Sequence, residues 1–160
     1  EDEIMASTIT AGTLKVTIRE SITLKGKDRG STTELSISNI NEVASRIITV
    51  PVSEVEVIAM STAVSSGTFV EGNVRYIRIT NLDDTNHVSL TFKNEDNDEF
   101  GVKLDKGQSF IYNGDMSGGV VDTMDAAATA ITPGTFADLV NITALADTAA
   151  CDVEVFVASV

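Results

Sequence analysis

The chain has 160 residues, of which 42% are hydrophobic and 5% aromatic, and its formal net charge is −13. This length and apolar content suit one globular domain with a core of its own and exclude intrinsic disorder. The excess of carboxylates opposes unassisted binding to nucleic acid or to anionic lipid, because both carry charge of the same sign.

The start of the chain shows no strand periodicity. We therefore expect residues 1–12 to form an N-terminal arm and residues 13–160 to form a single domain. Met5 and the residues after it resemble a natural translation start, which would make residues 1–4 an extension. No apolar run reaches the roughly 20 residues that span a bilayer.

Alternating apolar residues predict strands through the first half of the chain. Leu14, Val16 and Ile18 mark the first of these, which Ile22 and Leu24 extend towards a turn at residues 26–30. Further strands are expected at residues 34–38 and 47–50. Residues 55–60 are ambiguous between a short strand and a helical turn, and their β-branched residues favour a strand.

Residues 72–114 read almost without interruption as strands joined by acidic turns. Residues 73–82 suit a well-buried strand. Residues 88–92 and 100–104 alternate with period two, and the polar run 94–99 between them predicts a hairpin. A further strand is expected at residues 109–112.

After Gly114 the pattern lapses into a long, mostly irregular connection, residues 114–136, that is rich in small residues. Strands return at residues 139–145 and in the final stretch around Val153, Val155 and Val157. The total is eight to ten short strands with regular turn signals. The sequence therefore predicts an all-β, antiparallel β-sandwich of jelly-roll type.

The turn at residues 94–99 offers weak calcium candidates. Asn94, Asp96 and Asp98 alternate as ligands do in a calcium loop, but Glu99 stands where an EF-hand needs glycine. A solvated hairpin turn is the favoured interpretation. The sequence predicts no cofactor.

Two further residues have reactive side chains. His87 is the only histidine and stands beside Asp83 and Asp84, so we expect a turn histidine paired with an aspartate. Cys151 is the only cysteine, which excludes an intrachain disulfide, and we expect it to be a small buried residue. The sequence predicts no catalytic residue and no enzyme activity.

Two phrases carry a resemblance to a known class of protein. Residues 73–83, NVRYIRITNLD, and residues 104–110, LDKGQSF, together with the start at Met5 and the ending at residues 149–158, resemble small virion structural proteins of tailed phages, notably those of marine cyanobacteria. The resemblance covers most of the chain and contains no catalytic motif.

The resemblance implies a β-sandwich in a virion that is made in the host cytoplasm. The implied role is a capsid decoration or cement protein that binds the major capsid protein or another virion protein and forms a homo-oligomer, with a trimer favoured. Neither nucleic acid nor membrane is an expected partner. Residues 1–11 and 114–136 are the expected contact arms.

Two other functions stay open. A tail, fibre, receptor-binding or carbohydrate-binding module would share the sandwich and could use the loop at residues 94–99. An enzyme is the weakest alternative, because Asp83, Asp84, Asp96 and Asp98 lie in predicted turns where solvation explains them.

Overall fold

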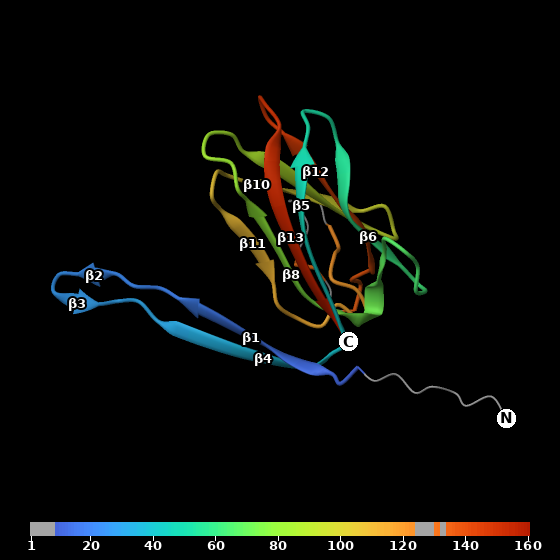
Figure 1. Ribbon diagram of the computed structural model, residues 1–160, viewed down its shortest axis with the longest axis horizontal. Helices are drawn as coiled ribbons and strands as arrows, with labels where there is room; N and C mark the ends of the chain where they lie inside the picture. Colours follow the sequence, from blue (N-terminus) through green and yellow to red (C-terminus); the bar gives the residue numbers. More distant parts are fainter. Residues whose placement is uncertain (1–8, 124–129, 132–133) are drawn as a thin grey trace. The chain divides into compact units, whose positions relative to one another are not determined.

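The computed structural model describes residues 9–123, 130–131 and 134–160 (Figure 1). The chain separates into two compact units, residues 1–42 with Val160, and residues 43–159. The described part holds thirteen strands and one short 3-10 helix. Ten of the strands have four or more residues, and β2, β3 and β7 have two each. The prediction of an all-β protein is confirmed.

The first unit is a two-stranded antiparallel ribbon, residues 12–40, drawn in blue in Figure 1. Strand β1 (Gly12–Arg19) pairs with β4 (Thr32–Ile40). Beyond them, β2 (Thr23–Leu24) pairs with β3 (Lys27–Asp28) at the tip. Lys25 and Gly26 connect β2 to β3 and both have positive φ, as a two-residue type I′ turn requires.

The backbone at Gly30 lies very close to the backbone of the opposite segment at Glu20. A Cβ on Gly30 would lie 1.9 Å from the carbonyl oxygen of Glu20, so only glycine fits there. Beside this point the Glu20 amide donates to the Ser31 carbonyl at 2.8 Å, and the Arg29 amide donates to the Ile22 carbonyl at 2.9 Å. These bonds join the tip hairpin to the longer strands.

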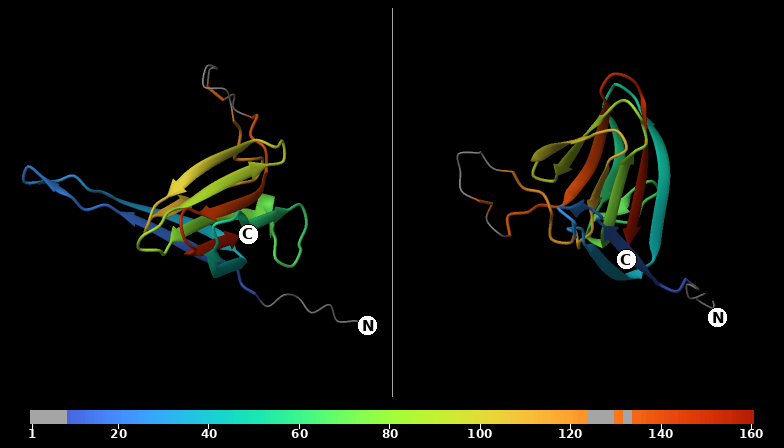
Figure 2. Two further views of the ribbon diagram at one scale, coloured as in Figure 1. Left: turned by 90° about the horizontal axis from the view of Figure 1, so that it is seen from above. Right: turned by 90° about the vertical axis from the view of Figure 1, so that its left-hand side faces the viewer.

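The second unit, residues 43–159, has two sheets and is called the two-sheet unit below; Figure 2 shows it from two further directions. The five-stranded sheet has the order β10-β9-β12-β6-β7, and the four-stranded sheet has the order β11-β8-β13-β5. The pairs β10-β9, β9-β12, β12-β6, β11-β8 and β8-β13 are antiparallel, and β6 pairs with β7 in parallel. The elements are β5 (Glu42–Val50), β6 (Val55–Ser61), β7 (Phe69–Val70), the 3-10 helix η1 (Glu71–Asn73), β8 (Val74–Asn81), β9 (Val88–Asn94), β10 (Glu99–Leu104), β11 (Ser109–Tyr112), β12 (Leu139–Ala146) and β13 (Cys151–Ser159).

One hydrophobic core draws on both sheets. Val88, Leu90 and Phe92 alternate along β9 and are almost completely buried. In the other sheet, Ile77 and Ile79 of β8 are equally buried. The same cluster includes Val50, Ile58, Ile142, Ala144, Val153, Val155 and Val157. The period-two alternation read from the sequence therefore separates the core face of β9 from its other face, whereas β8 and β12 also bury consecutive residues.

Most predicted strands are confirmed, with ends shifted by a few residues. The hairpin of β9 and β10 pairs Phe92 with Phe100 and Val88 with Leu104. The ambiguous stretch at residues 55–60 is a strand, β6. Residues 13–42 lie in the first compact unit and residues 43–159 in the second; the arm at residues 1–12 and the single domain at residues 13–160 stay predictions. Alternation marks both units in the same way and does not reveal which strands share a core.

The connection between β11 and β12 is mostly irregular where it is described, as predicted. Its described residues contribute an isolated bridge between Val121 and Ala137, and Met116 and Val121 join the core. Part of this connection, and residues 1–8 of the expected N-terminal arm, lie outside the described residues. Among the described elements, no helix is long and apolar enough to cross a membrane.

A fully buried amide holds one end of the two-sheet unit together. Asn81, 0% exposed at the end of β8, donates from Nδ2 to the carbonyls of Asn86 at 2.9 Å and Leu104 at 3.2 Å. Its Oδ1 accepts from the amide of Asp83 at 3.0 Å. The side chain thus ties β8 and β10 to the turn at residues 82–87.

We predict that Asn81→Ala lowers the free energy of unfolding by about 2–3 kcal/mol, because it leaves buried backbone groups without partners. Urea unfolding followed by circular dichroism measures the change. Asn73→Ala, at an exposed position after Gly72, is the matched control and should change stability by less than about 0.5 kcal/mol. An equal effect of the two substitutions would contradict the structural role of Asn81.

Candidate functional site

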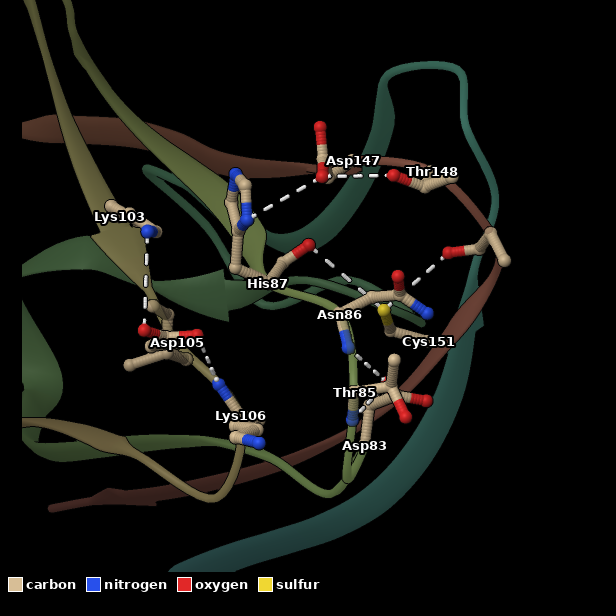
Figure 3. A network of polar contacts seen from close by, with 12 residues as sticks. Asp83, Thr85, Asn86, His87, Lys103, Asp105, Lys106, Asp147, Thr148 and Cys151 are labelled. Carbon is tan, nitrogen blue, oxygen red and sulfur yellow. Dashed lines mark hydrogen bonds and ion pairs between the residues drawn. The ribbon is translucent and has the colours of Figure 1, made fainter.

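The reactive side chains singled out in the sequence gather where the turn at residues 82–87 meets the turn between β12 and β13 (Figure 3). Nδ1 of His87 lies 3.6 Å from Oδ2 of Asp147. The two residues also pair through the backbone, since the Asp147 amide donates to the His87 carbonyl at 3.1 Å. The histidine's aspartate partner therefore comes from a distant turn and is neither Asp83 nor Asp84.

Asp83 organises its own turn. One of its carboxylate oxygens accepts the backbone amides of Thr85 and Asn86. These two hydrogen bonds lower the pKa of Asp83 below its ordinary value, because they favour the charged form. The carboxylate is therefore occupied in shaping a loop, and neighbouring Asp84 accepts from the Thr85 hydroxyl at 2.7 Å.

Cys151 is buried at the start of β13, as predicted. Its Sγ lies 3.5 Å from the carbonyl oxygen of Ala149 and 4.0 Å from that of His87. Burial raises the pKa of the thiol, and the negative charges of Asp83 and Asp147 raise it further. A nucleophilic cysteine needs the opposite shift, so this thiol suits packing.

Hydrogen bonds occupy the side chain of Asn94, the first of the calcium candidates. Asn94 is 4% exposed, and its side chain donates to the Val121 carbonyl at 2.9 Å and accepts from the Asp98 amide at 2.7 Å. The described residues contain no group of three or more His, Cys, Asp or Glu side chains placed to hold a metal ion. Asn94 thus works as a structural amide that anchors the turn of the β9–β10 hairpin and the segment around Val121.

Carboxylates nevertheless accumulate near this hairpin turn. A hollow of about 340 Å³ lies between the turn and β12, and Glu95, Asp98 and Glu99 line it. Close by, burial raises the pKa of Glu71, and the charges of Asp138 and Glu95 raise it further. This end of the five-stranded sheet therefore has a negative potential that favours cationic groups.

The most distinctive hollow is apolar. A pocket of about 100 Å³ lies between β10 and β11, the edge strands of the two sheets. Its lining consists of Ile77, Phe92, Phe100, Phe110, Tyr112, Met116, Val120, Val121 and Leu139. We call it the phenylalanine pocket. Because its lining is apolar, it suits an apolar group better than water, which needs two or more polar partners.

Aromatic contacts shape this pocket. The rings of Phe92 and Phe100 stack at 4.6 Å between centroids, with an interplanar angle of 2°. Phe110 approaches Phe92 from the other sheet at 4.8 Å. Phe100 nevertheless remains 37% exposed. Sequence reasoning assigned these rings to core packing and missed the pocket, because only the pairing of the two sheets brings them together.

The face of the four-stranded sheet that points away from the core carries a second aromatic and charged cluster. Arg78 pairs with Glu154 at 2.6 Å, and its guanidinium lies 5.8 Å from the centre of the Phe156 ring. Tyr76 meets the same ring edge-on at 5.8 Å. These side chains contact one another, and these contacts account for the cluster without a substrate.

No protein family model matches the chain, and no curated protein matches it. The site itself consists of acidic turns held by hydrogen bonds, a buried thiol and an apolar pocket between the edge strands β10 and β11.

We predict an effect of Asp83 on acid stability. The pKa of Asp83 is lower in the folded chain than its ordinary value of 3.8. The ionised carboxylate therefore stabilises the fold at pH values above 3.8. This contribution is lost as the pH falls through the lowered pKa. Asp83→Asn should therefore flatten the fall of the urea midpoint below about pH 4.

Asp84→Asn in the same turn is the control and should leave the pH profile close to that of the natural chain. If the urea midpoint of Asp83→Asn depended on pH as it does in the natural chain, the two amide hydrogen bonds would contribute nothing to acid stability.

Proposed function

We propose that this protein is a structural component of a virus particle, a capsid decoration or cement protein that binds copies of itself and the capsid shell. The resemblance of residues 73–83 and 104–110 to small virion proteins of tailed phages supports the assignment. We also propose that the two-sheet unit is a β-sandwich with the jelly-roll-like course predicted from the sequence. One core that draws on both sheets supports that fold.

The observation that carries the proposal is the ribbon. A two-stranded hairpin is marginally stable in water by itself, and three or more strands or a covering layer are needed for independent stability. The described residues of the ribbon's unit contain no second layer. Contact with another surface in an assembly would supply the missing layer and stabilise the ribbon. We infer that the ribbon serves such a contact.

A structural role also accounts for the polar side chains. His87, Asp83 and Asn94 hold turns, and the thiol of Cys151 is buried with a raised pKa. A role that consists of burying surface needs no converging acid, base or nucleophile. The negative charge would keep the unassembled chain soluble.

Rebinding to particles tests this function. Particles of the virus that encodes the chain are stripped of it with a mild chaotrope and mixed with increasing amounts of the purified protein. We expect binding to saturate at a fixed ratio to the major capsid protein, with density on the shell in electron microscopy.

Density confined to a tail or a single vertex would assign the chain to the tail or fibre instead. Absence of the chain from purified particles would overturn the virion assignment altogether.

A further inference from the structure

The ribbon has one apolar face. Its register places Leu14 opposite Ile37 and Val16 opposite Leu35. Ile18 continues this face and is 39% exposed. The intervening residues, among them Lys15 and Thr17, point to the other face and are polar. The ribbon is therefore amphipathic: Leu14, Val16, Leu35 and Ile37 are half-buried, and Ile18 is exposed.

The two-sheet unit has an apolar surface of matching character. Strands β10 and β11 each end their sheets, so within the described part of the chain each has one edge without a neighbouring strand. The phenylalanine pocket opens between them, and Phe100 at its lining keeps 37% of its surface exposed. We call these two strands and the pocket the β10–β11 flank. Exposed edges of this kind are sites at which further strands add.

Charge distinguishes the two surfaces. Residues 12–40 include five Lys or Arg and three Asp or Glu, a net charge of +2. Residues 43–159 include six Lys or Arg and seventeen Asp or Glu, a net charge of −11. The cations Lys25, Lys27 and Arg29 outnumber Asp28 at the ribbon tip. The carboxylates Glu95, Asp98 and Glu99 outnumber Lys93 around the hollow at the turn that leads into β10. Opposite potentials of this kind steer surfaces together and fix their orientation.

We propose that the ribbon of one copy docks its apolar face over the β10–β11 flank of a second copy of this chain. A second copy is the occupant that the sequence itself supplies, since every chain carries a cationic ribbon with an apolar face and also an apolar pocket with an acidic turn at the start of β10. The proposal deepens the structural function proposed above by naming the surfaces through which copies would meet.

Mixing two variants of the full chain tests the proposal. Ile18→Asp places a charge on the apolar face of the ribbon, and Phe100→Ser removes a ring from the flank. We expect the natural chain to form oligomers in light scattering, and each variant alone to associate at least tenfold more weakly, because a buried charge or a lost ring removes about 1.4 kcal/mol or more.

The mixture should regain a one-to-one dimer, because the intact ribbon of the Phe100→Ser chain meets the intact flank of the Ile18→Asp chain. Thr17→Asp, on the polar face of the same strand, and Leu145→Ser, at a residue 39% exposed on β12, are the matched controls and should assemble normally. A monomeric natural chain, or a mixture that stays monomeric, would overturn the proposal.

Crosslinking provides a second measurement at exposed positions, where folding is not at risk. Ile18→Cys in one chain and Glu99→Cys in a second, mass-tagged chain should be joined by a short bismaleimide, while buried Cys151 stays unmodified. Ile18→Cys with Val64→Cys is the control pair. Val64 is 92% exposed and lies in the loop between β6 and β7, at the other side of the five-stranded sheet from β10. This pair should not link.

The two proposals fail separately. A link formed only within one chain, in a protein with both cysteines, would show that the ribbon covers its own flank and would overturn docking between copies. Particle binding that persists in a chain without self-association would leave the virion function standing and remove only this inference.

Discussion

The structure depends on covering the apolar face that period-two alternation creates on every strand. A strand that pairs only with its neighbours gains backbone hydrogen bonds, but its aliphatic side chains still face water until a second layer covers them. In the two-sheet unit, one core with residues from both sheets provides this cover, and Val88, Leu90, Ile77 and Ile79 are nearly inaccessible to solvent. In the ribbon the described residues provide no second layer. The same pattern thus yields a nearly inaccessible core in one unit and a half-buried aliphatic face in the other.

Much of the secondary structure could be predicted because it depends on local signals. The hairpin of β9 and β10 follows from alternation on both sides of an acidic run, and β11 matches its predicted bounds. The separation of the ribbon could not be predicted, since Leu14 and Leu35 read like core residues in any strand. Which strands share a core is decided by pairings between distant segments, such as β13 with β5 and β8, and one sequence does not disclose them.

The interpretation of the reactive side chains was sound for Cys151, which is buried, and partly right for His87, which pairs with an aspartate other than its neighbours. The phenylalanine pocket had no signal of its own. Phe92 and Phe100 are linked by the hairpin register, but Phe110 reaches them from the other sheet. Asn81 could not be distinguished from an ordinary turn asparagine, because its burial depends on where β10 ends.

The ribbon and the phenylalanine pocket belong to different units of the chain. A contact between them would therefore join copies head to tail, through two different surfaces. A surface that binds itself satisfies both partners at once, whereas a ribbon that engages a different surface always leaves one ribbon and one flank unfilled at the ends of a row. Such a row stops growing only when its last copy meets its first. The angle between successive copies would then decide between a closed ring of fixed number and an open filament.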